Sequence, residues 1–193
     1  KPTPRGWLEL RPYIQSGYLL AGVGVVGGRP FRTLRDFFNN VSRLIAGYEL
    51  DPDALYDRLV ELASDVPAGA EGVHVDPLFT GSRSDPLAKA AIRELTPGTF
   101  TPGHMARALF EAMALQLADS YREAARLGAG QRSKLVGSGN GIRLNPVIRE
   151  SLEAEFGMPM QLGSHNEEAA VGAALCAAVA DGSFASIAEA SAQ

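Results

Sequence analysis

The most constraining stretch of this sequence is a short apolar run that ends in a cluster of glycines. Residues 134–141 read Lys-Leu-Val-Gly-Ser-Gly-Asn-Gly, and a helical pattern resumes at Pro146. Glycine has no Cβ, so its backbone amides can approach an anion or a planar ring closely. A following helix adds unpaired N–H groups and the positive end of its dipole. The pattern therefore favours a nucleotide-binding turn, although a tight strand-to-helix connection without a ligand explains the glycines about equally well.

The composition is that of a globular domain of ordinary size. The chain has 193 residues, of which 46% are hydrophobic and 21% are charged, which is enough to bury a core. Its net charge of −4 argues against non-specific binding to nucleic acid or to anionic lipid. No apolar stretch reaches the length of a membrane span. The single cysteine, Cys176, favours a reducing, cytoplasmic setting.

The spacing of apolar residues predicts a fold of the α/β class. In the first half, 7–13 and 18–26 are expected to form a hairpin, and the second strand is apolar enough to lie centrally in a sheet. We expect helices over 31–45, from Pro52 onward and over 102–127. Between the last two, residues 67–103 form an irregular segment with a short strand at 73–75.

The second half alternates strands and helices. The expected elements are a strand at 134–136, a helix at 146–156, a short strand near Met160 and an alanine-rich helix at 167–181. Such alternation implies parallel strands with helices packed on the sheet. After Gly182 we expect a frayed tail.

A second glycine pattern, Gly22-Val-Gly24-Val-Val-Gly27, matches the dinucleotide-binding fingerprint. Its valines continue a strand where the fingerprint needs a turn, and the acidic residues about 20 positions later lie between helices. We therefore interpret the match as accidental and place the turn at Gly27-Gly28. If this turn and residues 137–141 lie at adjacent strand ends, they form the kind of crevice in which α/β sheets bind ligands.

Residues 165–168, His-Asn-Glu-Glu, admit a metal site or an acid–base pair, but a helix start explains them better. Ser164 or Asn166 is expected to cap the last helix, and glutamates in its first turn are favourable for the dipole. No nucleophile–base set and no cluster with metal-ligand spacing emerges elsewhere. We therefore expect no catalytic residue and no metal ligand in this chain.

Several segments together resemble one family over nearly the whole chain. They include Leu135-Val-Gly-Ser-Gly-Asn-Gly-Ile-Arg-Leu-Asn145-Pro146, Phe156-Gly-Met-Pro-Met and Glu167-Glu-Ala-Ala-Val-Gly-Ala-Ala-Leu175. Upstream, Tyr18-Leu-Leu-Ala, Gly27-Gly28, Gly81-Ser-Arg83-Ser-Asp85-Pro86 and Gly103-His-Met-Ala-Arg107 occur in the same order. The chain resembles the C-terminal domain of the FGGY carbohydrate kinases, and within them the sedoheptulokinase-like branch.

The resemblance implies an actin-like ATPase fold of two ribonuclease-H-like domains, with ATP and sugar bound in the cleft between them. Residues 1–193 would be one such domain, with a mixed central sheet and helices packed on it, on the nucleotide side. It further implies that the adenine and ribose lie against Gly137, Ser138, Gly139 and Asn140. Further contacts are implied for Asn145, Gly28 and Arg32.

The chain departs from the family in what it lacks. The N-terminal domain with the sugar site and the catalytic aspartate is absent, and so is the Gly-Thr phosphate loop. Mg²⁺, like ATP, would therefore belong to the complete kinase, and we expect this chain to bind nucleotide weakly and not to turn over. The start Lys1-Pro-Thr-Pro fits a piece of a longer protein. The alternatives are a non-catalytic nucleotide-binding or interaction module of the same fold and, third, a dinucleotide-binding domain.

The missing domain also has a consequence for the surface. It would leave an apolar cleft wall exposed, so we expect a homo-oligomer or another partner to cover it. Expected ligands are therefore ATP or ADP, and a sugar only through the absent domain.

Overall fold

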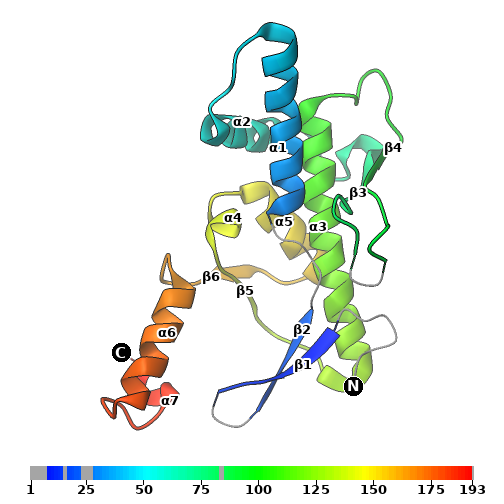
Figure 1. Ribbon diagram of the computed structural model, residues 1–193. Helices are drawn as coiled ribbons and strands as arrows, with labels where there is room; N and C mark the ends of the chain where they lie inside the picture. Colours follow the sequence, from blue (N-terminus) through cyan, green and yellow to red (C-terminus); the bar gives the residue numbers. More distant parts are fainter. Residues whose placement is uncertain (1–7, 15–16, 23–27, 83–84, 193) are drawn as a thin grey trace.

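The computed structural model describes residues 8–14, 17–22, 28–82 and 85–192. It is a mixed α/β structure (Figure 1). The helices and strands in chain order are β1 (Leu8–Pro12), β2 (Tyr18–Gly22), α1 (Arg29–Val41), η1 (Ser42–Ala46), α2 (Pro52–Ser64), η2 (Ala70–Gly72), β3 (His74–Asp76), β4 (Ala91–Arg93), α3 (Pro102–Ala124), η3 (Ala125–Ala129), β5 (Leu135–Gly137), α4 (Asn140–Arg143), α5 (Pro146–Phe156), β6 (Met160–Leu162), α6 (Glu168–Ala180) and α7 (Ile187–Ala190).

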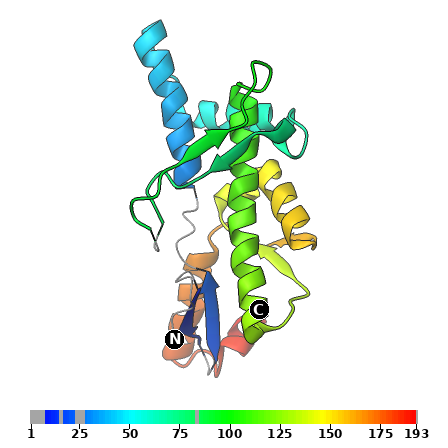
Figure 2. The same cartoon turned by 90° about the vertical axis from the view of Figure 1, so that its right-hand side faces the viewer.

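The long helix α3 is the centre of the core (Figures 1 and 2). Its first turn is capped by the Thr101 hydroxyl, which accepts from the His104 amide at 3.3 Å, and strong helix formers fill its length. Helices α2 and α5 pack along it, and α1 joins them through Phe31. The Phe31 ring stacks on Phe110 with centroids 4.6 Å apart and meets Tyr56 edge-on at 4.8 Å. One apolar cluster therefore holds four helices together.

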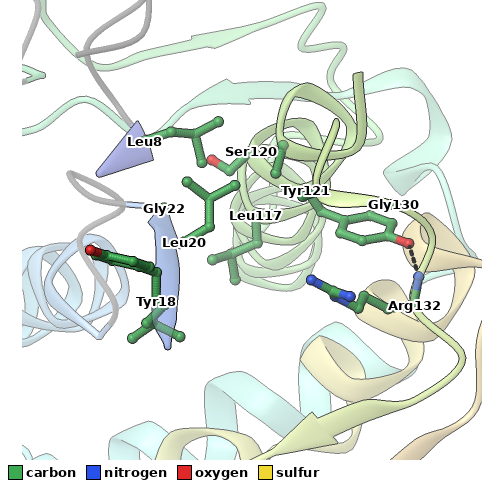
Figure 3. Close-up of a pocket in the computed structure, with 12 residues that line it drawn as sticks. Leu8, Tyr18, Leu20, Gly22, Leu117, Ser120, Tyr121, Gly130 and Arg132 are labelled. Carbon is green, nitrogen blue, oxygen red and sulfur yellow. Dashed lines mark hydrogen bonds between the residues drawn. The ribbon is translucent and has the colours of Figure 1, made fainter. Parts of the chain in front are cut away.

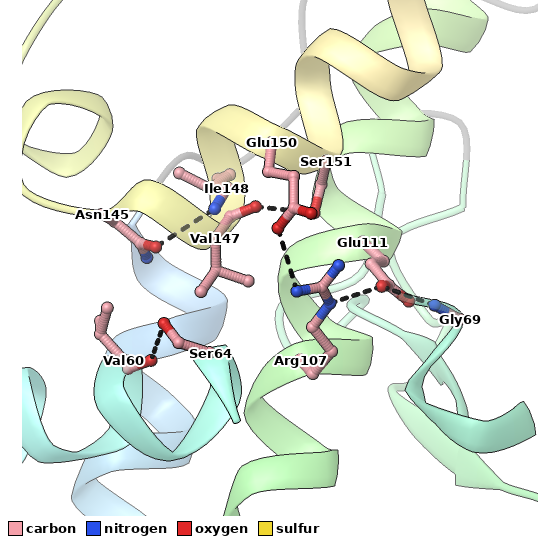
Figure 4. Close-up of polar contacts among 10 residues, drawn as sticks. All are labelled: Val60, Ser64, Gly69, Arg107, Glu111, Asn145, Val147, Ile148, Glu150 and Ser151. Atoms are coloured by element: carbon pink, nitrogen blue, oxygen red, sulfur yellow. Dashed lines mark hydrogen bonds and ion pairs between the residues drawn. The ribbon is translucent and has the colours of Figure 1, made fainter. Parts of the chain in front are cut away.

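A buried cation fixes two segments onto α3. Arg107 is only 4% exposed, and its guanidinium donates to Glu111 at 2.6 Å and to Glu150 of α5 at 3.2 Å (Figure 4). Glu111 also accepts from the Gly69 amide at 2.9 Å. A guanidinium can be buried only where carboxylates compensate its lost hydration. The network therefore sets how α5 and the loop at Gly69 sit on α3.

The sheets differ from the expected mixed central sheet. The described residues form three separate two-stranded ladders: β1–β2 and β3–β4 are antiparallel, and β5–β6 is parallel. The alternation correctly predicts the parallel pair, but β2 pairs with β1 alone and is largely exposed instead of central. A sheet becomes continuous only when a strand bridges neighbouring ladders. Among the described residues no strand lies between β1–β2 and β5–β6.

The C-terminal tail is not frayed as expected. Residues 187–190 form α7, whose N-terminus is capped by the Ser186 hydroxyl accepting from Glu189 at 3.1 Å. In the turn before it, the Ser183 hydroxyl donates to Asp181 at 2.6 Å and lowers the pKa of that carboxyl. Side-chain caps of this kind order short segments that have no apolar periodicity. In the described part of the chain, no helix combines the length and the apolar character needed to cross a bilayer.

Replacing Arg107 with alanine tests the role of the buried cation. The two carboxylates would lose their partner and α5 its anchor, so R107A should lower the free energy of unfolding by about 2 kcal/mol. Exposed Arg126, which pairs with Glu123 at 2.6 Å, is the matched control, and R126A should change stability by less than about 0.5 kcal/mol. Urea unfolding followed by circular dichroism measures both. Equal effects of the two substitutions would contradict the structural role of Arg107.

Candidate functional site

The turn at residues 137–141 needs glycine at two positions for different reasons. Gly137 ends β5 in a close fit, because a Cβ there would overlap Met160 and would lie 2.8 Å from Ile142 Cγ2. Gly139 has φ +85°, a conformation that favours glycine, yet a Cβ on it would meet no atom within 4 Å. Gly137 is therefore required by packing. Gly139 is required by backbone shape and faces open space.

The polar side chains of this turn make no hydrogen bonds with other described residues. Ser138 and Asn140 are exposed, and neither side chain has a hydrogen-bond partner among the described residues. The Gly139 carbonyl accepts from the amides of Ile142 and Arg143, both at 3.1 Å, and so begins the short helix α4. The turn thus presents a hydroxyl and an amide side chain on a backbone that is itself hydrogen-bonded.

Two arginines hold the far side of the turn. Arg143 donates to the Gly163 carbonyl at 2.6 Å, to the His165 carbonyl and to the Glu168 carboxylate at 2.6 Å. Arg149 donates to the carbonyls of Ile142 at 3.0 Å and of Arg143 at 2.5 Å. Charge-assisted bonds to the last carbonyls stabilise a helix end. Together they fix α4 between β5 and the segment that enters α6.

A carboxylate also lies beside the turn. The Arg143 guanidinium holds the pKa of Glu168 below its usual range, and the Gly139 amide lowers it further. At neutral pH this corner therefore holds a carboxylate–guanidinium ion pair next to the glycine backbone. A carboxylate in such a pair can still accept hydrogen bonds from hydroxyl groups.

Asn145 joins the turn to the core. Its side chain is 1% exposed and caps α5 by accepting from the Ile148 amide at 3.1 Å (Figure 4). It also lies beside Tyr56 of α2, whose pKa is raised mainly by burial. A buried amide must satisfy its polar atoms within the protein. The structure thus places Asn145 behind the turn, whereas Ser138 and Asn140 are on its outside.

Gly28 and Arg32 belong to the N-terminal end of α1. Gly28 is the N-cap and has no side-chain cap, and its carbonyl accepts from the Arg32 amide at 3.0 Å. The side chains of Arg29 and Arg32 are exposed and have no polar partner in the part of the chain that the structure describes. Figures 1 and 2 place α4 beside this end of α1. An uncapped helix N-terminus with two free cations therefore borders the same region as the glycine turn.

The expected pairing of two glycine turns at adjacent strand ends is not seen. Gly27 lies outside the described residues, as does most of the Gly22–Gly27 pattern, and β2 does not pair with β5. Two cavities lined by described residues lie elsewhere: one lies under the β1–β2 hairpin (Figure 3) and the other between α1 and α2. Neither is lined by Gly28, Arg32 or residues 137–141. The candidate site is the region where α4 lies beside the start of α1.

The expected cap of the last helix is also wrong. α6 begins at Glu168 after Glu167, and no side chain caps it. Glu168 is held instead by Arg143, a contact between residues 25 positions apart that local helix signals do not reveal. Within the described ranges, no three His, Cys, Asp or Glu side chains gather to hold a metal ion.

Comparison with known proteins identifies what the chain is similar to. The model of the C-terminal domain of the FGGY family of carbohydrate kinases matches residues 13–180. Human sedoheptulokinase is 26% identical over 176 residues, which are 90% of this chain and 35% of that protein. Glycerol kinase of Dechloromonas aromatica (strain RCB) is 32% identical over 168 residues, covering 86% of this chain and 30% of the relative. The chain thus spans about a third of the length of these relatives.

Solved structures agree with this similarity. Xylulose kinase from Rhodospirillum rubrum matches with a TM-score of 0.70 and 25% identity over 97% of this chain and 36% of that one. Plasmodium falciparum glycerol kinase with ADP has a TM-score of 0.70 over 95% of this chain and 35% of that one, and at 20% identity it bears on the fold alone. The described chain therefore has the shape of one part of a longer kinase.

The contact between Arg143 and Glu168 makes stability depend on pH. Because the pKa of Glu168 is lowered on folding, its contribution is fully present above about pH 4.5, the ordinary value, and is lost as pH falls through the folded pKa. The difference in unfolding free energy between the wild type and E168Q should therefore shrink toward zero in acid. Exposed Glu167, which has no such partner, supplies the control E167Q. A difference for E168Q that stays constant down to pH 2 would contradict the assignment.

Proposed function

Since the chain belongs to the FGGY family of carbohydrate kinases, we propose that it is the nucleotide-side, ribonuclease-H-like domain of an ATP-dependent sugar kinase. The complete reaction would convert sugar and ATP to sugar phosphate and ADP in the cytoplasm. The single observation that carries the proposal is the turn at 137–141, where Gly139 opens onto free space and the exposed side chains of Ser138 and Asn140 have no hydrogen-bond partner among the described residues.

The chemistry of the turn suits the adenosine part of the nucleotide. A backbone without a Cβ at Gly139 lets a planar base lie flat against it. The Ser138 hydroxyl and the Asn140 amide offer both donors and acceptors to the base edge or the ribose. The Glu168 carboxylate beside Gly139 can accept a hydrogen bond from a ribose hydroxyl. The base and ribose are therefore proposed to bind here, with the phosphates pointing away.

The remaining sequence-predicted residues take different parts in this proposal. Arg32, exposed at the start of α1, would reach the nucleotide from the opposite side, and Gly28 would let the nucleotide approach the helix end closely. Asn145 would act from behind the turn, because its buried amide is already bonded to Ile148. Its proposed contribution is to fix the position of the turn.

Catalysis is assigned to the part of the kinase that lies beyond this chain. Phosphoryl transfer depends on positioning the phosphates, on Mg²⁺ and on a base that takes the sugar proton. Among the described residues, no group of three His, Cys, Asp or Glu side chains is placed to hold a metal ion, and the proposal assigns Mg²⁺ to the complete kinase. The chain alone is therefore proposed to bind nucleotide weakly and to transfer no phosphate. The alternative is a non-catalytic nucleotide-binding or interaction module of the same fold.

Substitution of Gly139 tests the proposed site. Valine at this position would force a branched side chain into the open space and strain the backbone, so G139V should abolish nucleotide binding in calorimetry. Gly182 has φ +87° and equally open surroundings but lies at the end of α6, so G182V imposes similar strain away from the site. It should bind like the wild type. Equal binding by G139V would place the pocket elsewhere.

Assays with different ligands separate nucleotide binding by this chain from phosphate transfer by the complete kinase. If this chain holds only the base and ribose, adenosine, ADP and ATP should bind the wild type with similar affinity. Sugar phosphate should form only when the remaining part of a kinase is supplied. ATP turnover by the isolated chain would contradict the proposal that catalysis lies in the remaining part of the kinase. Binding of NAD without ATP would contradict the kinase assignment.

A further inference from the structure

The outer end of the glycine turn carries the one Asn-Gly pair of the sequence, Asn140-Gly141. An asparagine can react with its own backbone, because the amide nitrogen of the next residue can reach the side-chain carbonyl carbon. A Cβ on that next residue crowds the nitrogen, and glycine has none. The other four asparagines are followed by asparagine, valine, proline and glutamate. Asn140 is therefore the asparagine whose neighbour hinders this reaction least.

The structure leaves both reacting groups accessible. Asn140 and Gly141 are exposed, and neither the Asn140 side chain nor the Gly141 amide has a hydrogen-bond partner among the described residues. A Cβ at Gly141 would meet no atom within 4 Å, so the attacking nitrogen lies in open surroundings. Groups that make no hydrogen bond can turn toward each other without first losing one.

The helical backbone at Asn140 opposes the reaction only weakly. Helical φ and ψ angles turn the following nitrogen away from the side-chain carbonyl carbon, so residue 140 must leave α4 before the two atoms can join. α4 has four residues, and the Asn140 carbonyl is held in it by one hydrogen bond, from the Leu144 amide at 2.9 Å. Such short helices are marginal by themselves and open readily. Local opening of α4 therefore brings the reacting atoms within reach of each other.

The remaining asparagines lack one or more of these conditions. The side-chain oxygens of Asn39 and Asn40 accept hydrogen bonds at 2.9 and 3.2 Å. Asn145 is 1% exposed, and the proline that follows it has no amide proton. Asn166 is exposed like Asn140, but a glutamate follows it. Asn166 thus provides a comparison within the same molecule.

We propose that Asn140 is a site of spontaneous deamidation. After a base in the solvent has taken its proton, the Gly141 nitrogen bonds to Cγ of Asn140, and the side-chain nitrogen takes up a proton and leaves as ammonia. Water then opens the resulting succinimide ring at either of its two carbonyl carbons. One opening gives aspartate in a normal main chain. The other gives isoaspartate, in which the main chain runs through the side-chain carbon.

Either product changes the turn that precedes α4. A carboxylate only accepts hydrogen bonds, whereas the amide that it replaces also donates them. Isoaspartate in addition lengthens the main chain by one carbon atom directly after Gly139. Deamidation should therefore weaken the binding of adenosine at the turn. This consequence rests on the proposed function, whereas the modification itself does not.

Ageing of the full chain at mildly alkaline pH, followed by peptide mass spectrometry, tests the site. The peptide that contains Asn140 should gain the mass difference between an amide and an acid and should separate into two products, while the peptide with Asn166 stays unchanged. The rate should rise with pH, because the attacking nitrogen must lose its proton. Modification of Asn166 at the same rate would overturn the proposal.

A pair of glycine substitutions isolates the role of the neighbouring residue. There is room for a Cβ at Gly141, so G141A should keep the fold and slow the modification about tenfold or more by crowding the nitrogen. Gly172 of α6 also has room for a Cβ and follows no asparagine, so the control G172A should react at the wild-type rate. The difference should persist in urea, where no helix contributes. Equal rates for G141A and G172A would overturn the proposal.

Calorimetry with adenosine separates this inference from the proposed nucleotide site. The aged wild type should bind adenosine more weakly than the fresh protein, whereas G141A should bind alike before and after ageing. An unmodified Asn140 after ageing would overturn the inference and leave the nucleotide site untouched. Modification without any loss of binding would contradict the placement of the nucleotide at the turn, and the modification site would still stand.

Discussion

The buried side chain of Asn145 is the contact on which the candidate site depends. It is 1% exposed, caps α5 by accepting from the Ile148 amide and lies beside Tyr56 of α2, so it ties the segment after the glycine turn to the centre of the core. α5 is in turn held on α3 by the Arg107–Glu150 pair and by apolar packing. A turn that must fit a rigid ligand needs such support, because a loosely held backbone loses binding energy to ordering. The exposed residues of the site therefore rest on a buried polar contact.

The structure has a well-packed part and a part whose apolar side chains are exposed. Helices α1, α2, α3 and α5 share one apolar core, and the glycine turn stands on it. The hairpin and α6 expose apolar surface instead, and the described residues of the hairpin form a ladder of only two strands. Local packing among the described residues therefore supports the glycine turn more firmly than it supports the hairpin.

Much of this arrangement could be predicted from the sequence where the signals are local. Asn145-Pro146 and Asp51-Pro52 each place a capping side chain before a proline at the first helical position, and both helices begin there. The glycines at 137 and 139 were correctly placed between a strand and a helix, although the short helix α4 begins six residues earlier than the expected one at Pro146.

What could not be predicted depends on distant residues. The Arg143–Glu168 pair joins positions 25 apart, and no periodicity encodes it, so the sequence instead predicts a local cap at Ser164 or Asn166. The division of the described strands into three two-stranded ladders could not be predicted, because apolar alternation shows that a segment is a strand but not which strands are neighbours. The exposure of Ser138 and Asn140, as against the burial of Asn145, also follows only from three-dimensional packing.

The most direct measurement of the central claim is an NMR titration of the isotope-labelled chain with adenosine. The account predicts that the amide signals of residues 137–141 and of the first turn of α1 shift together, with those of β1, β2 and α6 unchanged. A saturable shift confined to these two segments would establish that they form one pocket for the base and ribose. Shifts confined to the groove under the hairpin, or no shift at all, would contradict it.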